Sequence, residues 1–240
     1  LYVEADDGPD TFDILSRIFG LVSFSPVDAV TSSNLDEIGK KAVEIASIHS
    51  FETYAIRCRR TGNHPYNSQE AAKLTGDAVG VAFPDAKVDL SNPNFIINVE
   101  IRENRAYIYT QVIAGPGGLP LGTQGVVLGV LKEERDLLGL WLMLRRGCYL
   151  TVFTQDEKLV QPLKLWDPDL RIIEGSLNKE NIISALENVG GLGIVFGDTQ
   201  LKTYPQYENI TVFAPSAFLD DQIVNTALEN IKEGSVPNLT

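Results

Sequence analysis

VIAGPGGLPLGTQGVVLGVLKEERDLLGLWLMLRRG, residues 112–147, decides the fold of the second half of the chain. It contains a glycine- and proline-rich linker, an apolar strand at 126–130 and a helix at 133–146 that Gly147 closes. Further apolar runs predict strands at 149–154, 170–174, 193–196 and 210–214, with helices at 181–188 and 220–233. Strands that alternate with helices predict a parallel sheet covered on both faces.

The turn at 131–136 is where a parallel α/β domain that binds a nucleotide brings backbone N–H groups to phosphate, and small residues allow this. This chain has LKEERD there, with three carboxylates and no glycine, which repels phosphate. Glu133 and Asp136 can be interpreted as an acid/base pair, but acids also favour the start of a helix, and we prefer that interpretation. Asp198, at the end of another expected strand, marks the position of a residual small-molecule site.

Toward the N-terminus the pattern predicts a small β-α-β piece, with strands at 1–4 and 21–30 around a helix at 11–19. It is too small to bury its own faces. The next region predicts αβαββ over residues 32–113. Its expected elements are helices at 35–47 and 67–83, a strand at 51–60, and a hairpin of 95–101 with 105–112 around Glu103-Asn104.

Composition limits the class of protein. The chain of 240 residues is 44% hydrophobic and carries a net charge of −12, which describes a soluble protein with two compact domains and part of a third. It has no apolar run of membrane-spanning length and no signal-peptide pattern, so we expect a cytoplasmic protein that does not bind membranes. Cys58 and Cys148 are the only cysteines and form no CxxC pair, so we expect buried, inert thiols and no metal site.

One strip of the acidic chain is basic. Residues 53–67 contain three arginines and a histidine and no acid. Arg57 and Arg59 fall on one strand face. The planar guanidinium group of arginine can donate two parallel hydrogen bonds to a phosphate. The alternative is a solvated face paired with neighbouring acids. The full set of candidate RNA-binding residues is Arg57, Arg59, Arg60, His64, Tyr66, Lys87 and Asn92. Lys87 and Asn92 are the weaker members, and Tyr66 is a base-stacking or a packing residue.

Three motifs occur in order: YAIRCRRTGNHPY (54–66), VDLSNPN (88–94) and GPGGLPLGTQG (115–125). This arrangement resembles the THUMP domain of the ThiI-type tRNA 4-thiouridine synthetases. The resemblance implies the second half of a ferredoxin-like domain at 1–31, with its first half missing from this chain, and a THUMP domain at 32–113. It further implies a Gly/Pro linker at 114–125 and a Rossmann-like PP-loop domain at 126–240. The linker is then an interdomain hinge, or a mobile loop that contacts RNA.

The resemblance also implies a function. In that family the first two parts grip tRNA at its acceptor stem and 3′ end, the PP-loop domain adenylates a uridine with ATP, and a cysteine persulfide delivers sulfur. The family's SGGxDS loop corresponds here to the LKEERD turn, which keeps only Asp136, and LGIVFGDTQ (192–200) matches a second nucleotide-contacting segment only in part. No CxxC or rhodanese-like extension follows.

We therefore expect a tRNA-binding protein linked to tRNA modification. The PP-loop is degenerate, and we expect no catalytic residue and no cofactor. The last domain would form the interface of a homodimer or bind a partner enzyme. The alternatives are a divergent tRNA sulfurtransferase that still uses ATP, and a scaffold without an RNA ligand.

Overall fold

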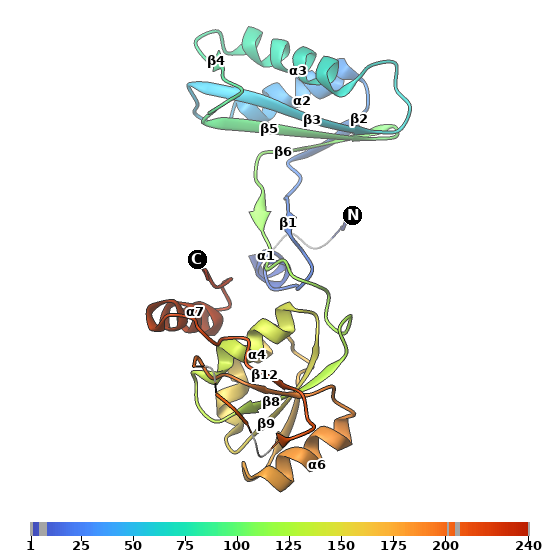
Figure 1. Ribbon diagram of the computed structural model, residues 1–240. Helices are drawn as coiled ribbons and strands as arrows, with labels where there is room; N and C mark the ends of the chain where they lie inside the picture. Colours follow the sequence, from blue (N-terminus) through green and yellow to red (C-terminus); the bar gives the residue numbers. More distant parts are fainter. Residues whose placement is uncertain (1, 5–8, 201, 205–206, 240) are drawn as a thin grey trace. The chain divides into compact units, whose positions relative to one another are not determined.

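The computed structural model describes residues 2–4, 9–200, 202–204 and 207–239. The chain divides into two compact units (Figure 1). We call Ser25–Ile113 the central unit, and Leu1–Phe24 together with Ala114–Thr240 the terminal unit. The two units are described separately below, and the domain boundaries expected from the sequence stay predictions.

The central unit is a five-stranded mixed sheet with two helices. Its strands lie in the order β2 (Ala29–Ser32), β6 (Arg105–Tyr109), β5 (Phe95–Arg102), β3 (Thr53–Thr61) and β4 (Lys87–Val88). β3 runs parallel to β5 and β4, whereas β6 is antiparallel to β5 and β2. With α2 (Leu35–Ala46) and α3 (Ser68–Ala82), the order confirms the predicted αβαββ pattern and adds β2 and β4 as short edge strands.

Both helices of the central unit begin at an asparagine. The Asn34 side chain accepts hydrogen bonds from the first N–H groups of α2, and Asn67 forms a complete capping box with Glu70 at α3. Figure 1 shows α2 and α3 on the same face of the sheet. Alternate residues of β5 turn toward them and are buried, from Phe95 to Ile101. The other face of this sheet carries no helix of the central unit.

The terminal unit is built on a five-stranded, all-parallel sheet, which confirms the predicted α/β class. Its strands lie in the order β10 (Arg171–Glu174), β9 (Tyr149–Thr154), β8 (Val126–Leu131), β11 (Ile194–Phe196) and β12 (Val212–Phe213). The chain order reverses between β8 and β11. In open parallel sheets this switch point is where a ligand binds, beyond the carboxyl ends of the strands.

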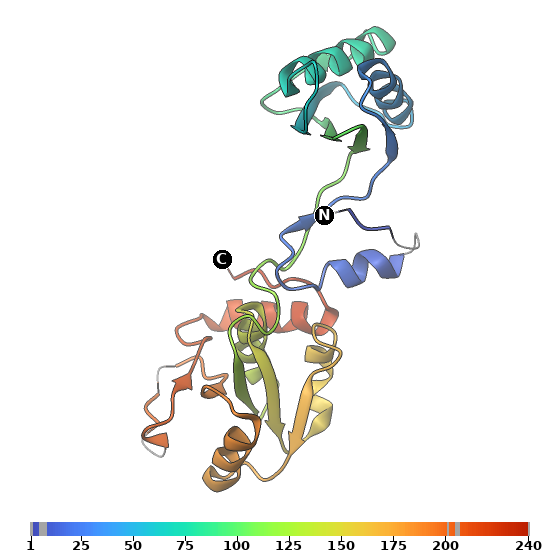
Figure 2. The ribbon, with the colours of Figure 1, turned by 90° about the vertical axis from the view of Figure 1, so that its right-hand side faces the viewer.

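Helices cover both faces of this sheet (Figure 2). One face packs against α4 (Asp136–Arg145) and α7 (Asp221–Glu233), and the opposite face packs against α6 (Lys179–Val189). The short helices η1 (Glu157–Val160) and α5 (Gln161–Lys164), which the sequence pattern did not indicate, lie on the first of these faces. Successive residues of the central strand turn to alternate faces, so Val127 belongs to one core and Leu128 to the other.

The N-terminal segment differs from the expected β-α-β piece. Tyr2–Glu4 form no strand, and Leu1 lies outside the described residues. The helix α1 spans only Pro9–Leu15, and Phe19 beyond it packs against Trp141 and Trp166 at centroid distances of 5.6 and 5.5 Å.

The strand expected at 21–30 is divided into β1 (Ser23–Phe24) and β2. Pro26 lies in the gap between them, where it has no N–H to donate to a ladder. β1 pairs with β7 (Ile113–Ala114) in a separate two-stranded sheet. Whether residues 1–31 are half of a ferredoxin-like domain stays a prediction.

The glycine-rich linker packs closely against the end of α4. Arg145 Nε donates to the carbonyl of Pro116 at 3.0 Å, and the N–H of Leu119 donates to the carbonyl of Arg145 at 3.0 Å. Gly118 has φ +73°, and a Cβ there would lie 2.1 Å from the Arg145 carbonyl oxygen. The glycines therefore give this loop a defined shape within the terminal unit.

Candidate nucleic-acid interface

Arg57 and Arg59 lie side by side on the helix-free face of the central sheet. Both point away from the core because β3 alternates, with Tyr54 and Ile56 buried and these two arginines exposed. In the register with β5, Arg57 is opposite Asn98 and Arg59 is opposite Glu100. The predicted shared face is thus confirmed, and neither arginine forms an ion pair with any described residue.

The same face carries six further residues that sequence reasoning missed. The register of the hairpin sets Arg102 opposite Arg105, Glu100 opposite Tyr107 and Asn98 opposite Tyr109. We call the open sheet face the set Arg57, Arg59, Asn98, Glu100, Arg102, Arg105, Tyr107 and Tyr109. It holds four arginines against one carboxylate. Because Glu103 and Asn104 form a two-residue turn, their position alone would have predicted these cross-strand pairs.

Charge on the open sheet face is only partly neutralised. Arg102 Nε donates to Glu100 Oε1 at 2.7 Å, and the Nη2 of the same guanidinium donates to that oxygen as well. Arg105 is exposed and makes no ion pair with a described residue. Three guanidinium groups therefore face solvent without a carboxylate partner.

Arg60, His64 and Tyr66 form a separate cluster at the end of β3. Arg60 Nη1 donates to the carbonyl of Gly62 at 2.6 Å and to His64 Nδ1 at 3.2 Å, while His64 Nε2 donates to the carbonyl of Glu103. These partners require the neutral tautomer with the proton on Nε2. Arg60 Nε is buried without a hydrogen-bond partner among the described residues.

Tyr66 is engaged within the fold. Its hydroxyl donates to the carbonyl of Ser33, its ring lies 5.3 Å from that of His64, and it packs on the core of the central unit. Burial raises the pKa of this hydroxyl. The structure thus assigns Tyr66 a packing contact, which was one of the two interpretations of the sequence.

Lys87 and Asn92 lie at the other end of the sheet. Lys87 is exposed and pairs with Thr53, the first residue of β3, whereas His64 follows Thr61, the last. Eight residues of strand separate the two ends by about 26 Å. The Asn92 N–H donates to Asp89 Oδ1 at 3.0 Å, and this bond, with the one from Ser91, lowers the pKa of Asp89. The seven candidate residues are therefore three groups and not one patch.

A second candidate site is the switch point of the terminal unit. Helix α4 begins at Asp136 and not at the expected 133, because Asp136 Oδ2 accepts the backbone N–H groups of Lys132 at 2.8 Å and Glu133 at 3.2 Å. Burial raises the pKa of Asp136, against the lowering effect of those two bonds. The acid/base interpretation of Glu133 with Asp136 has no support in these contacts, since the Asp136 carboxylate is held by backbone.

Several other charges near the switch point are paired. Asp198 accepts from Lys202 and from the Tyr204 hydroxyl, and these bonds lower its pKa although burial opposes them. Arg135 pairs with Asp221, and Lys232 pairs with Glu134. A Cβ at Gly197 would lie 2.2 Å from the Asp136 Cα, so the two loops are in direct contact. The edge of the sheet is thus filled by its own side chains.

The thiols are not activated. Burial raises the pKa of Cys58 to about 11, although Arg60 opposes the shift, and burial also raises the pKa of Cys148. In the described part of the chain, no three His, Cys, Asp or Glu side chains gather as a metal-binding group. None of the described helices has the length and apolar composition needed to cross a bilayer.

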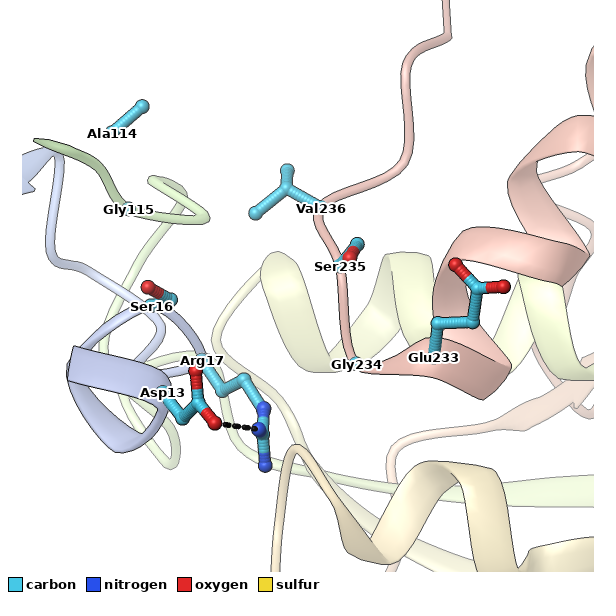
Figure 3. Close-up of a pocket in the computed structure, with 9 residues that line it drawn as sticks. All are labelled: Asp13, Ser16, Arg17, Ala114, Gly115, Glu233, Gly234, Ser235 and Val236. Atoms are coloured by element: carbon cyan, nitrogen blue, oxygen red, sulfur yellow. Dashed lines mark ion pairs between the residues drawn. The ribbon is translucent and has the colours of Figure 1, made fainter. Parts of the chain in front are cut away.

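A pocket of about 420 Å³ lies between α1 and the end of α7 in the terminal unit (Figure 3). Arg17 and Asp13 face each other in it at 3.8 Å, with Glu233 on the opposite side. Ser16 donates its hydroxyl to the carbonyl of Phe12 at 2.8 Å, so it is not positioned as a nucleophile. The lining therefore presents one cation between two carboxylates and no catalytic pair.

The fold and the two sites define an α/β protein with an arginine-bearing sheet in one unit and a parallel sheet in the other. Residues 32–111, which lie within the central unit, match the family model of the THUMP domain. A probable tRNA sulfurtransferase of Methanothermobacter thermautotrophicus is 43% identical over 163 residues, or 65% of this chain and 42% of that protein. A second one, of Methanobrevibacter smithii, is 38% identical over 156 residues, or 62% and 40%.

Residues 32–111 thus match the THUMP domain, and the chain is similar to the tRNA sulfurtransferases over about three fifths of its length and spans about two fifths of theirs. Solved structures agree on the fold. PH1313 of Pyrococcus horikoshii has a TM-score of 0.77 at 25% identity, covering 92% of this chain and 80% of its own. A 4-thiouridine synthetase solved with RNA and ATP has a TM-score of 0.75 at 19% identity, covering 98% and 75%.

Proposed function

We propose that this protein binds tRNA through its central unit and takes part in tRNA modification without ATP-dependent catalysis of its own. The observation that carries the proposal is the pair Arg57 and Arg59, exposed and without an ion pair, on the helix-free face of the unit that matches the THUMP domain. Guanidinium groups bind phosphate through two parallel hydrogen bonds. The relatives named tRNA sulfurtransferases support tRNA as the RNA concerned.

The remaining candidates take different roles in this proposal. Arg60 and His64 hold the loop after β3 through their own hydrogen bonds, and the second Nη of Arg60 is left for RNA. Tyr66 supports that loop by packing. Lys87 and Asn92, at the far end of the sheet, make at most an outlying phosphate contact.

A local basic face on an acidic chain suits selective binding. The chain as a whole carries a net charge of −12 and repels bulk polyanion. Only RNA that presents its backbone to the open sheet face gains enough phosphate contacts to overcome that repulsion. Affinity must then fall steeply with salt.

The degenerate PP-loop is also part of the proposal. The backbone N–H groups of Lys132 and Glu133, which stand where a phosphate would bind, are already held by the Asp136 carboxylate. Glu133 and Glu134 add two exposed carboxylates beside them. These residues do not fit a triphosphate.

The domain organisation proposed with this function is a ferredoxin-like piece at 1–31, a THUMP domain at 32–113, a linker at 114–125 and a Rossmann-like domain at 126–240. The last domain then serves as a surface for a second copy or for a partner enzyme in the cytoplasm. Modification of the bound tRNA would be carried out by that partner.

Filter binding of intact tRNA and of tRNA trimmed at its 3′ end, each at two salt concentrations, tests RNA binding. We expect salt-sensitive binding that weakens when the 3′ end is removed. Equal, weak retention of both RNAs at low salt would reject the proposal and leave a scaffold without an RNA ligand.

A divergent, ATP-dependent tRNA sulfurtransferase is the second candidate, favoured by the 43% identity to a protein of that name. Calorimetry with millimolar ATP and magnesium separates it from the first. We expect no heat of binding beyond dilution. Saturable ATP binding that competes with pyrophosphate would favour the enzyme and contradict a degenerate PP-loop.

A further inference from the structure

Two tyrosines stand next to the unpaired arginines on the open sheet face. Tyr107 and Tyr109 are two residues apart on β6, so both project from the same side of the sheet at a spacing of about 7 Å. Both are half-buried, and Ala106 and Ile108, the residues alternating with them, are fully buried in the helix-covered core. The tyrosine side chains therefore lie on the sheet surface and not within the core.

The tyrosines and arginines share one electrostatic neighbourhood. Burial raises the pKa of the Tyr109 hydroxyl, Glu100 adds to this effect, and the positive charges of Arg59 and Arg102 oppose it. These three residues come from β3 and β5, and the register sets Asn98 of β5 directly opposite Tyr109. The two tyrosines of β6 and the arginines of β3, β5 and β6 thus lie on one face of three adjacent strands, with Asn98 and Glu100 between the tyrosines and Arg57 and Arg59.

This combination matches the chemistry of unpaired nucleotides. Bases stack on aromatic side chains displayed on an open sheet, while neighbouring cations bind the phosphates between them. A duplex cannot use such a surface, because its bases are already stacked and paired. An apolar protein partner would bury the guanidinium groups of Arg57, Arg59 and Arg105, which pair with no carboxylate of a described residue.

We infer that Tyr107 and Tyr109 form a stacking platform for unpaired nucleotides of a bound RNA, with Arg57, Arg59 and Arg105 holding the phosphates on either side. The inference rests on the proposed RNA binding and adds to it the position and the chemistry of the single-stranded contact.

The test compares a short RNA hairpin carrying an unpaired 3′ tail with the same hairpin without the tail, using the full chain. Tyr109→Leu keeps an apolar side chain and removes the aromatic face, whereas Tyr109→Phe keeps the ring. We expect Tyr109→Leu to weaken binding of the tailed RNA by roughly fivefold to a hundredfold and to leave the blunt RNA unchanged. Tyr109→Phe should bind both RNAs as the parent chain does, and Tyr107→Leu should repeat the loss.

Tyr149→Leu is the matched control, because Tyr149 is an exposed strand tyrosine of the terminal unit. Urea midpoints of all variants establish that each is folded at the assay temperature. If the parent chain binds tRNA but Tyr109→Leu and Tyr107→Leu keep its preference for the tailed RNA, the stacking platform is wrong and RNA binding stands. If the parent chain binds neither RNA, the proposed function itself fails.

Discussion

The central and terminal units differ in their balance of charges and in which cations are paired. Residues 25–113 contain nine lysines and arginines against eleven acids, whereas the rest of the chain contains eleven against twenty-one. In the terminal unit, cations such as Arg135, Lys202 and Lys232 are held in ion pairs. In the central unit, Arg57, Arg59 and Arg105 are exposed without such a pair. A cation is available to a ligand only where the fold has not already paired it.

The same contrast holds for the backbone. At the switch point of the terminal unit, N–H groups that a ligand could use are taken by Asp136. On the open sheet face, backbone groups are satisfied by the β ladders and the side chains remain to bind. We therefore expect changes in the terminal unit to affect stability and changes on the open sheet face to affect RNA binding. The four predictions that follow test this division.

The largest expected effect is on the core of the terminal unit. Phe19→Ala removes the ring that packs between Trp141 and Trp166, and it should cost about 3–5 kcal/mol of unfolding free energy. Both tryptophans of the chain belong to this cluster, so fluorescence during urea unfolding reports on the terminal unit. Ile97→Ala is the control, because Ile97 is fully buried in the central unit. A shift of the tryptophan transition by Ile97→Ala would contradict two separate cores.

This packing shows where prediction from sequence ends. The apolar stripe of residues 11–19 predicted a helix, but the partners of Phe19 lie more than 120 residues away in the sequence. Phe19 is buried against Trp141 and Trp166, and α1 ends at Leu15. Local pattern identifies such a residue as apolar and gives no information on what it will contact.

The second prediction concerns the open sheet face. Arg57→Ala with Arg59→Ala should weaken tRNA binding by about 3 kcal/mol, or roughly a hundredfold, if each arginine makes one charge-assisted contact. The slope of log affinity against log salt should fall by roughly 1.5. Filter binding at several salt concentrations measures both. The control is Arg171→Ala, an exposed arginine of β10 in the terminal unit.

A loss of binding free energy in Arg171→Ala that is half the loss in the double variant, which removes twice the charge, would show that binding follows net charge and not the open sheet face. That result would remove the contrast between the two units. An unchanged salt slope in the double variant would indicate that these arginines do not contact phosphate.

The open sheet face itself could largely be predicted from the sequence. Alternation in β3 placed Arg57 and Arg59 together, and the structure confirms this. The two-residue turn at Glu103 and Asn104 fixes the hairpin register, and with it the position of Tyr109 opposite Asn98. What the sequence did not provide is the order of the strands, because adjacency of β3 and β5 joins segments forty residues apart.

The role of Asp136 could not be predicted in the same way. A carboxylate at the start of a helix is usually exposed and interacts with the helix dipole. Here α4 begins at Asp136 itself, and the side chain turns back to the N–H groups of Lys132 and Glu133. The direction of a buried side chain depends on the packed loops around it, in this case on contact with Gly197.

The third prediction uses the pKa of Asp136. Burial raises it, so the folded protein keeps this proton to higher pH than the unfolded chain does. The contribution of Asp136 to stability is therefore greatest at low pH and falls as pH rises from the ordinary value of 3.8 through the raised pKa. Asn at this position is uncharged and can still accept hydrogen bonds from the backbone N–H groups. The stability of Asp136→Asn should therefore not fall over this pH range through ionisation at this position.

Urea unfolding of the parent chain and of Asp136→Asn between pH 4 and pH 7 measures the difference. As pH rises, the free energy of unfolding of the variant should increase relative to that of the parent by about 1 kcal/mol. Parallel curves for the parent and Asp136→Asn would mean that the buried carboxylate is not destabilised by burial.

The smallest expected effect is at Lys87. It lies on β4 opposite Thr53, so Arg57 and Arg59 are about 13 and 20 Å from it along β3. Both distances exceed the Debye length of about 8 Å, so salt screens this exposed lysine from phosphates bound to those arginines. Lys87→Ala should therefore weaken tRNA binding by less than about 0.5 kcal/mol, which filter binding beside Arg59→Ala would resolve. A loss at Lys87 equal to that at Arg59 would mean that RNA covers the whole length of β3, so the candidate residues would act as one long site and not as three groups.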